Sequence, residues 1–366
     1  NHFYLMIDKS KILGAFELEN SQADFFQAFN ILIDSLNEEA NLNLVGRKAV
    51  EYQIKQHLRN RIDISKAFEK KVEEKVSKPI IVIGLPRSGT TFLFNLMSRD
   101  QGNRSPLFWE MNKPLPLVNS KSLIGRSRIL KSDLTLAFKD RIIPKLDDLH
   151  AIKSNSPEEC LLIKVFALQS ILYFYMANTP SYLDYLSNCD TTMGYSWHHK
   201  FLNILETRDK PQRWLLKDPS HLGNLEEILS FYPDASFVHI TRDPAETLPS
   251  ICSLTAQVRR GFSRDVDLKD LGIKTLKFWE KSNNKNNAQR QNLSDKNYLQ
   301  VKYTDLIDDP INLVKDIYKN FSIQLDDLTV SKMKSYVEEG SKEARVKHEY
   351  ALEDYGLNKS QVHNKL

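Results

Sequence analysis

The sequence is poor in cysteine: Cys160, Cys189 and Cys252 are the only three in 366 residues, and none forms a Cys-x-x-Cys pair. This spacing argues against a zinc ribbon or a disulfide framework and favours a reducing compartment, so we expect a cytoplasmic protein. The first twelve residues lack the apolar core of a cleavable secretory signal. The sequence also lacks a large excess of charge of either sign, because 51 basic and 47 acidic residues leave a net charge of +4. A nucleic-acid partner is therefore not expected.

The sequence also lacks a clean apolar run long enough to cross a bilayer. The best candidate is CLLIKVFALQSILYFYMA, residues 160–177, which Lys164, Gln169 and Ser170 interrupt. We therefore predict a buried core helix there and no integral membrane span.

Four short, mostly apolar stretches are each followed by a helical pattern. They are residues 80–83, 213–217, 236–241 and 298–303. Alternation of strand and helix is typical of a parallel sheet covered on both faces. The sequence thus predicts an α/β fold of P-loop type, a parallel sheet flanked by helices.

The rest of the chain has mainly helical patterns. Residues 1–75 place Phe25, Phe29, Leu32 and Leu36 on one helix face, and no Gly/Ser/Pro linker follows them. We predict a helical N-terminal segment, 1–75, packed on a main α/β domain, 76–366. Within that domain, residues of about 120–205 form a helical insertion over the pocket.

One stretch, IIVIGLPRSGTTFLFNLM, residues 80–97, resembles a phosphate-binding loop without its lysine. Gly84 and Gly89 have the Walker spacing, but Thr90 occupies the lysine position and a positive charge stands inside the loop at Arg87. The loop is preceded by a strand and followed by a helix N-terminus, and this arrangement favours binding of an anion. Hydroxyl groups for the anion would come from Ser88, Thr90 and Thr91.

The missing lysine argues against hydrolysis of ATP or GTP, where lysine holds the β- and γ-phosphates and an acidic residue helps to hold Mg²⁺. A sulfuryl donor carries less negative charge and needs no Mg²⁺. His198 and His199 have no third ligand at metal spacing in the sequence. We therefore predict no metal.

A second stretch, FVHITRDPAETLPSICSL, contains a helix start. Asp243, Pro244 and Glu246 have the pattern of a capped N-terminus. That pattern leaves Arg242 and Ser250 unexplained, and the two could together bind a second phosphate.

Several segments together resemble the PAPS-dependent sulfotransferases, most closely their bacterial branch, which is akin to tyrosylprotein sulfotransferases. These segments are GLPRSGTTFLFNLM, WEMNKPLP, WLLKDPSHLGNLEEILSFYPDASFVHITRDPAETLPS and KHEYALEDYGL, and the similarity runs from about residue 79 to about 358. The resemblance implies that the 5′-phosphosulfate is bound by Arg87, Ser88, Gly89, Thr90 and Thr91. It implies that Arg242 and Ser250 hold the 3′-phosphate.

The resemblance is incomplete near the C-terminus. The RKG signature of cytosolic members is absent, and SKEARVKHEY stands in its place. No role is therefore assigned to Arg345 or Lys347.

Sulfuryl transfer to an alcohol needs a base for the acceptor proton and a cation near the bridging oxygen. We favour Glu110, in SPLFWEMNKPLP, because similar members place a glutamate just after the P-loop helix. His221, in KDPSHLG, is the rival base. Cytosolic members use a histidine shortly after a lysine at a strand end, and the spacing of Lys217 and His221 resembles that pattern. Lys217 itself is expected to stabilise charge.

Other candidates have a structural explanation. In NSPEECLL we expect Ser156 to cap a helix that Pro157 begins, so that Glu158 and Glu159 only stabilise its dipole. The aromatic side chains that could line an acceptor pocket are more often core residues: Trp109, Tyr173, Tyr175 and Trp197.

The sequence thus favours a sulfotransferase that moves a sulfuryl group from PAPS to a hydroxyl or amine of a small-molecule, lipid or glycan acceptor. A P-loop phosphotransferase and a non-catalytic nucleotide-binding protein are the alternatives. The sequence predicts neither the acceptor nor the oligomeric state.

Overall fold

A parallel five-stranded sheet forms the centre of the protein. The structure, a computed structural model, describes residues 6–16, 23–70, 76, 78–143, 152–342 and 351–366. The strand order is β2-β3-β1-β4-β5 and every pairing is parallel. The strands are β1 (Ile80–Ile83), β2 (Asn103–Arg104), β3 (Arg213–Lys217), β4 (Ser236–Thr241) and β5 (Tyr298–Lys302). The predicted fold class is confirmed, and β2 is an edge strand that the sequence did not indicate.

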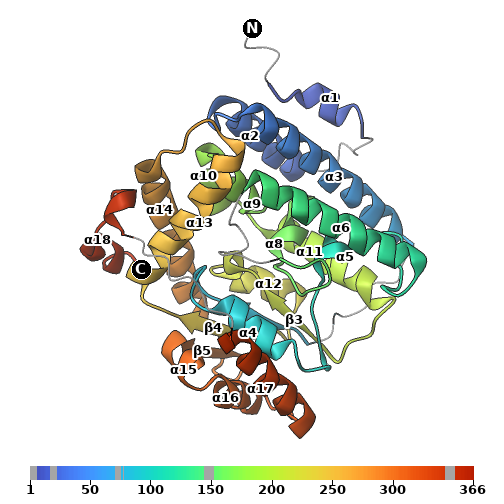
Figure 1. Cartoon of the computed structure of the whole chain (residues 1–366), viewed down its shortest axis with the longest axis vertical. Coiled ribbons are helices and arrows are strands. Elements are labelled where there is room, and N and C mark those ends of the chain that lie inside the picture. Colours follow the sequence, from blue (N-terminus) through green and yellow to red (C-terminus); the bar gives the residue numbers. More distant parts are fainter. Residues whose placement is uncertain (1–5, 17–22, 71–75, 77, 144–151, 343–350) are drawn as a thin grey trace.

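Strand β1 is apolar throughout because helices cover both faces of the sheet. Ile80 and Val82 pack in one core with side chains of α4 (Thr90–Met97), α16 (Pro310–Asn320) and α17 (Asp327–Lys342). Ile81 and Ile83 belong to the other core, with side chains of α11 (Thr192–Glu206), α12 (Leu225–Phe231), α13 (Pro244–Phe262) and α14 (Leu268–Arg290). Successive side chains of a strand point to opposite faces, so a strand buried on both sides has no polar positions. Figure 1 shows these helices on either side of the strands.

The N-terminal helices are part of this second core. They are α1 (Lys9–Leu13), α2 (Ala23–Glu38) and α3 (Leu44–Phe68). Phe25, Phe29, Leu32 and Leu36 of α2 are all buried, as their spacing predicted. They share their core with Phe201 of α11. The boundary near residue 75 stays a prediction, because residues 71–75 lie outside the described part of the chain.

Most of the helices between β2 and β3 lie on the same side of the sheet as α2 and α3 (Figure 1). They are α5 (Phe108–Asn112), α6 (Leu123–Ile142), α8 (Leu161–Lys164), the 3₁₀ turn η2 (Val165–Ala167), α9 (Leu172–Met176), α10 (Pro180–Asn188) and α11. The remaining elements are the 3₁₀ turns η3 (Pro219–His221) and η4 (Glu353–Tyr355), α15 (Tyr303–Asp308) and α18 (Lys359–His363).

Residues 160–177 are buried as predicted, but they do not form one helix. The chain breaks at Leu168, whose φ of 52° is left-handed. The Ser170 hydroxyl donates to the Leu161 carbonyl at 2.8 Å and accepts from Leu172 N at 3.2 Å, so it replaces helical hydrogen bonds on both sides of the break. The prediction of a continuous core helix was therefore wrong. None of the helices among the described residues is long and apolar enough to cross a membrane.

Candidate active site

The P-loop joins β1 to α4, and its two glycines are required by close contacts. Gly84 has φ of 148°, and a Cβ there would lie 2.5 Å from the Ile240 carbonyl oxygen. Gly89 has φ of 99°, and a Cβ there would lie 2.8 Å from the ring of Tyr303. Helix α4 begins immediately after Gly89, so its free N–H groups point into the loop, where an anion is favoured.

The side chains of the loop divide into two groups. Arg87, Thr90 and Thr91 line the cavity beside the loop. Ser88 is buried instead, and its hydroxyl donates to the Leu85 carbonyl at 2.7 Å. Ser88 thus stabilises the turn, so any contact with a phosphate would come from its backbone.

The structure brings together the three residues expected near two phosphates. Arg87 Nε donates to Ser250 Oγ at 3.1 Å, and Arg242 Nη1 donates to the Arg87 carbonyl at 3.1 Å. Arg242 also stacks on Tyr303, with its Cζ atom 4.1 Å from the ring centroid. Two guanidinium groups on neighbouring loops form a site suited to phosphate oxygens.

The start of α13 differs in one detail from its predicted capping pattern. Asp243 caps the helix by accepting from Ala245 N at 2.8 Å, as expected. Glu246 does not complete a capping box. Its carboxylate accepts from Arg242 at 2.8 Å, because the guanidinium lies one turn away on the same surface.

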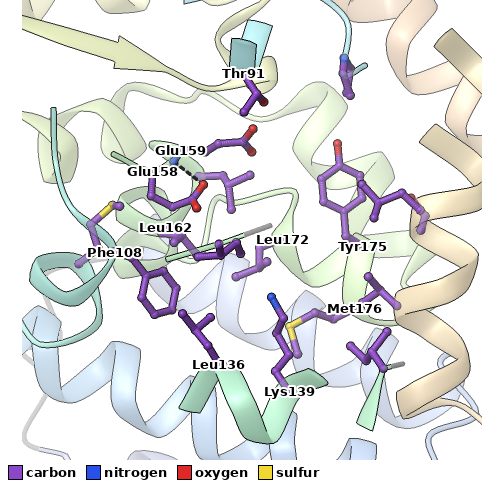
Figure 2. A pocket seen from close by; sticks show the side chains of 18 of the residues that line it. Thr91, Phe108, Leu136, Lys139, Glu158, Glu159, Leu162, Leu172, Tyr175 and Met176 are labelled. Atoms are coloured by element: carbon purple, nitrogen blue, oxygen red, sulfur yellow. Dashed lines mark hydrogen bonds between the residues drawn. The ribbon is translucent and has the colours of Figure 1, made fainter. Parts of the chain in front are cut away.

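Lys217 links the P-loop to a carboxylate. It is buried at the end of β3, and its Nζ atom donates to Thr91 Oγ1 at 3.1 Å. The same ammonium forms an ion pair with Glu159. Figure 2 shows the Glu159 carboxylate beside Thr91, at the end of the cavity nearest the loop.

Backbone hydrogen bonds hold Glu159 in this position. Cys160 N donates to the Lys217 carbonyl at 2.8 Å, and Glu158 N donates to the Pro106 carbonyl at 3.0 Å. Helix α8 begins only at Leu161, so the prediction that Ser156 and Pro157 start a helix was wrong. Glu158 and Glu159 both line the cavity rather than a helix N-terminus.

Glu110 lies in α5, away from the cavity. Its buried carboxylate accepts from Arg104 Nη2 at 2.7 Å and 2.9 Å and also forms an ion pair with Arg208. It caps its own helix by accepting from Leu107 N at 2.9 Å. Neighbouring residues of α5 line the cavity, whereas Glu110 does not. The geometry therefore does not support the expectation that Glu110 takes the acceptor proton, because both carboxylate oxygens are engaged elsewhere.

His221, the rival base, is fully buried and is not among the residues that line the cavity. Its Nδ1 atom lies 2.9 Å from the Tyr195 hydroxyl. Burial, with a smaller effect of Lys164, holds the pKa of His221 well below its usual value, so the ring is neutral. The imidazole ring packs against the rings of Tyr195 and His198.

One cluster of potential metal ligands forms that the sequence spacing did not indicate. Cys160, His198 and His221 are buried, and their ligand atoms lie within 4.8 Å of one another. Lys164 lies close enough to this group to lower the pKa of both histidines. A cation in the cluster would be opposed by that charge. His199 is not part of the cluster.

A cavity of about 1380 Å³ extends from the P-loop between α3, α6, α9 and α13. Near the loop its lining includes Arg87, Thr91 and Glu159. Farther away the lining is mainly apolar, with Lys139 as a charged exception, and the walls include Leu136, Leu162, Leu172, Met176, Leu254, Val258 and Phe262. Figure 2 shows these two ends, with Glu158 and Glu159 toward Thr91 and leucine and methionine side chains toward α6.

Tyr175 belongs to the cavity, whereas the other three aromatic candidates are buried. Its hydroxyl has no hydrogen-bond partner among the described residues. Burial, followed by the nearby carboxylates of Glu159 and Asp218, raises the pKa of Tyr175 well above its usual value. The hydroxyl is therefore protonated and can donate to a bound molecule. Trp109, Tyr173 and Trp197 are core residues, as expected.

Arg345 and Lys347, for which the sequence indicated no role, lie outside the described residues.

Comparison with known proteins gives consistent results. Residues 79–327 match the model of the sulfotransferase family. The chain is 22% identical over 283 residues to omega-hydroxy-beta-dihydromenaquinone-9 sulfotransferase Stf3 of Mycobacterium bovis, covering 74% of this chain and 70% of that protein. A protein of the same name from Mycobacterium tuberculosis matches equally.

Solved structures share the fold over nearly the whole chain. Sulfotransferase STF1 from Mycobacterium tuberculosis superimposes with a TM-score of 0.83 at 28% identity, covering 100% of this chain and 96% of that one. Sulfotransferase STF9 from Mycobacterium avium gives a TM-score of 0.84 at 21% identity, with coverage of 97% and 92%. The match to the family model spans more than half of the sequence and includes the P-loop, Lys217 and Arg242, so this chain belongs to the PAPS-dependent sulfotransferase family.

Proposed function

We propose that this chain transfers the sulfuryl group of PAPS to a hydroxyl group of an apolar, lipid-like acceptor. The cavity carries this proposal, because it joins a P-loop with two arginines to a region lined mainly by apolar side chains. A glycan would need polar walls, whereas this lining is mainly leucine, isoleucine, valine, methionine and aromatic side chains. The relative Stf3 is named for a hydroxylated menaquinone, which supports an isoprenoid type of acceptor.

The donor would bind along the loop. Backbone N–H groups of Ser88 to Thr91 and the guanidinium of Arg87 face its 5′-phosphosulfate end, and Arg242 with Ser250 holds the 3′-phosphate. Arg87 contacts Ser250 directly, so one arginine lies between the two anionic ends. The family relation and this grouping of cations support these assignments.

We assign the general base to Glu159 in place of Glu110. The acceptor hydroxyl attacks the sulfur atom, its proton passes to the Glu159 carboxylate, and the bond from sulfur to the phosphate oxygen of 3′,5′-ADP breaks. Lys217 lies beside both Glu159 and Thr91, so its charge can stabilise the oxygen on which negative charge develops. The products are the sulfate ester and 3′,5′-ADP.

Tyr175 has a place in this arrangement as a positioning residue. Figure 2 shows its hydroxyl directed toward the end of the cavity where Glu159 lies. A protonated phenol there can donate to the acceptor oxygen and orient it for attack. No metal is required, because Arg87, Arg242 and Lys217 supply the positive charge, and turnover should survive dialysis against EDTA.

The proposal is tested by ligand-induced stabilisation and by turnover. We expect 3′,5′-ADP to raise the melting temperature far more than ATP with Mg²⁺ does. We also expect transfer of ³⁵S from labelled PAPS to farnesol, a fifteen-carbon isoprenoid alcohol, but not to glucose. Stabilisation by ATP alone would exclude PAPS as donor, and transfer to glucose but not farnesol would exclude the apolar acceptor.

A further inference from the structure

Helix α6 has apolar side chains on the face that it turns to solvent. Leu123, Leu130, Leu134 and Phe138 are each between 60% and 86% exposed. Their spacing of seven, four and four residues places them on one stripe of the helix. The opposite face, with Gly125, Ser132 and Leu136, is the buried one. A helix that covers a globular core normally has a polar outer face, whereas the outer face of α6 has an apolar stripe between its exposed polar side chains.

Helix α3 contributes a second group on the other side of the cavity mouth. Leu44, Val45 and Tyr52 are between 47% and 63% exposed, and all three line the cavity. Leu134 and Phe138 of α6 line it as well. We call these exposed side chains of the two helices the apolar rim: Leu44, Val45, Tyr52, Leu123, Leu130, Leu134 and Phe138. Five of these seven side chains, all except Leu123 and Leu130, also line the cavity, so the rim adjoins the interior of the acceptor cavity.

Basic residues accompany the rim. Helix α6 contains five basic and two acidic residues, so its formal net charge is +3. Arg126, Lys131 and Arg141 are exposed on it, and exposed Lys48 of α3 lines the cavity mouth. Apolar side chains flanked by lysine and arginine are the combination by which peripheral proteins bind an anionic membrane surface.

We propose that the apolar rim inserts into the surface of a bilayer that contains anionic phospholipid, and that the acceptor passes from the membrane directly into the cavity. This inference rests on the proposed function in taking the acceptor to be a lipid. It explains why apolar side chains remain exposed around the entrance, where a water-soluble acceptor would gain nothing from them. Since none of the described helices could span a membrane, the attachment would be peripheral.

The test uses two rim residues that do not line the cavity, Leu123 and Leu130. In the double variant Leu123→Glu/Leu130→Glu, glutamate is tolerated in an exposed helix, so folding should be preserved. The matched control, Ile273→Glu/Leu328→Glu, places the same charges at exposed apolar positions on α14 and α17. Melting temperatures of both variants should equal that of the wild type.

We expect the wild type to co-sediment with vesicles of phosphatidylcholine and phosphatidylglycerol in equal parts, and more weakly with phosphatidylcholine alone. The rim variant should bind the mixed vesicles about tenfold or more less tightly, because two side chains can no longer enter the apolar layer. The control should bind like the wild type. Equal binding by rim variant and wild type, or no binding of the wild type to mixed vesicles, would overturn the proposal.

Turnover separates this proposal from the proposed function. With farnesol in solution, the rim variant should transfer sulfate at the wild-type rate, whereas with farnesol embedded in mixed vesicles its rate should fall by about the loss in binding. If neither the wild type nor the rim variant sulfates farnesol in either form, the proposal of a lipid acceptor is excluded. Vesicle binding then still tests whether the apolar rim binds a membrane surface. A wild-type dimer that the rim variant dissociates, without vesicle binding, would show that the rim instead joins two copies of the chain.

Discussion

Lys217, at the end of β3, is ion-paired with Glu159, a residue that lies 58 positions earlier in the chain. This pair stands at the junction of the P-loop and the acceptor cavity. It therefore provides the sharpest test of the proposed mechanism.

Replacing Glu159 by glutamine keeps the size of the side chain and removes the base. We expect kcat to fall by about 10²–10⁴, the usual contribution of a positioned general base. Affinity for 3′,5′-ADP should change little, because Arg87 and Arg242 are untouched. Steady-state rates and isothermal titration measure the two effects separately. His221→Ala, below the site, should cost less turnover; the opposite ranking would return the role of base to the histidine.

Glu110→Gln should act on stability more than on the chemical step. The substitution weakens the hydrogen bonds of a buried carboxylate to Arg104 and Arg208, each of which is worth about 1.5–3 kcal/mol when one partner is charged. We expect the free energy of unfolding, measured in urea, to fall by about that amount. Asp209→Asn is the control, since this more exposed partner of the same arginines should cost less than about 1 kcal/mol. A variant as stable as the wild type but without turnover would restore Glu110 as the base.

Arg242→Ala should weaken binding of 3′,5′-ADP, but not of 5′-AMP, which has no 3′-phosphate. The lost charge-assisted contact is worth about 1.5–3 kcal/mol, or about a 10- to 150-fold rise in Kd. Glu246→Gln serves as the control, because it releases Arg242 from its carboxylate partner while the guanidinium remains. Equal losses for the two nucleotides would place Arg242 away from the 3′-phosphate.

The free energy of unfolding should fall as the pH is lowered from about 6.5 toward 4. Burial lowers the pKa of His239 to about 4, and it holds the pKa of His198 and His221 well below the usual 6.5. Below pH 6.5 the unfolded chain binds protons that the folded chain does not, so each of these histidines costs about 1.4 kcal/mol per pH unit. Urea unfolding at pH 7 and pH 5 measures the difference.

His239→Gln provides the matched variant for this pH effect. Glutamine retains a partner for the Tyr298 hydroxyl, which lies 2.7 Å from His239 Nδ1. The variant should lose less stability between pH 7 and pH 5 than the wild type. The same pH dependence in both proteins would mean that His239 titrates alike in the folded and unfolded states.

The strands and the P-loop could be predicted because local patterns determine them. A short run of apolar residues followed by a glycine-bounded loop predicts a buried strand that ends at the loop, and no distant contact is needed to recognise it. Arg87, Arg242 and Ser250 could be grouped for a related reason, since parallel strands end at one edge of the sheet. Strand β2 has only two residues, too few for any period to be visible.

The position of Glu159 could not be predicted from the sequence, because the contacts that decide it are tertiary. In NSPEECLL the sequence has a sound capping pattern, yet helix α8 begins only at Leu161, and contacts with distant parts of the chain place Glu159 beside Lys217. Glu110 looked favourable because similar members of the family place a glutamate just after the P-loop helix. Its two arginine partners, Arg104 and Arg208, belong to separate parts of the chain.

The hydrogen bond from Cys160 N to the Lys217 carbonyl has an evolutionary consequence. It holds the segment that contains Glu159 against β3 through main-chain atoms. Replacing a side chain does not remove these atoms. Helix α6 precedes that segment in the chain and contributes Leu134, Leu136 and Phe138 to the lining of the cavity. Under the proposed mechanism, descendants of a common ancestor could exchange α6 for other sequences and acquire new acceptors, while Glu159, the proposed base, keeps its place beside Lys217.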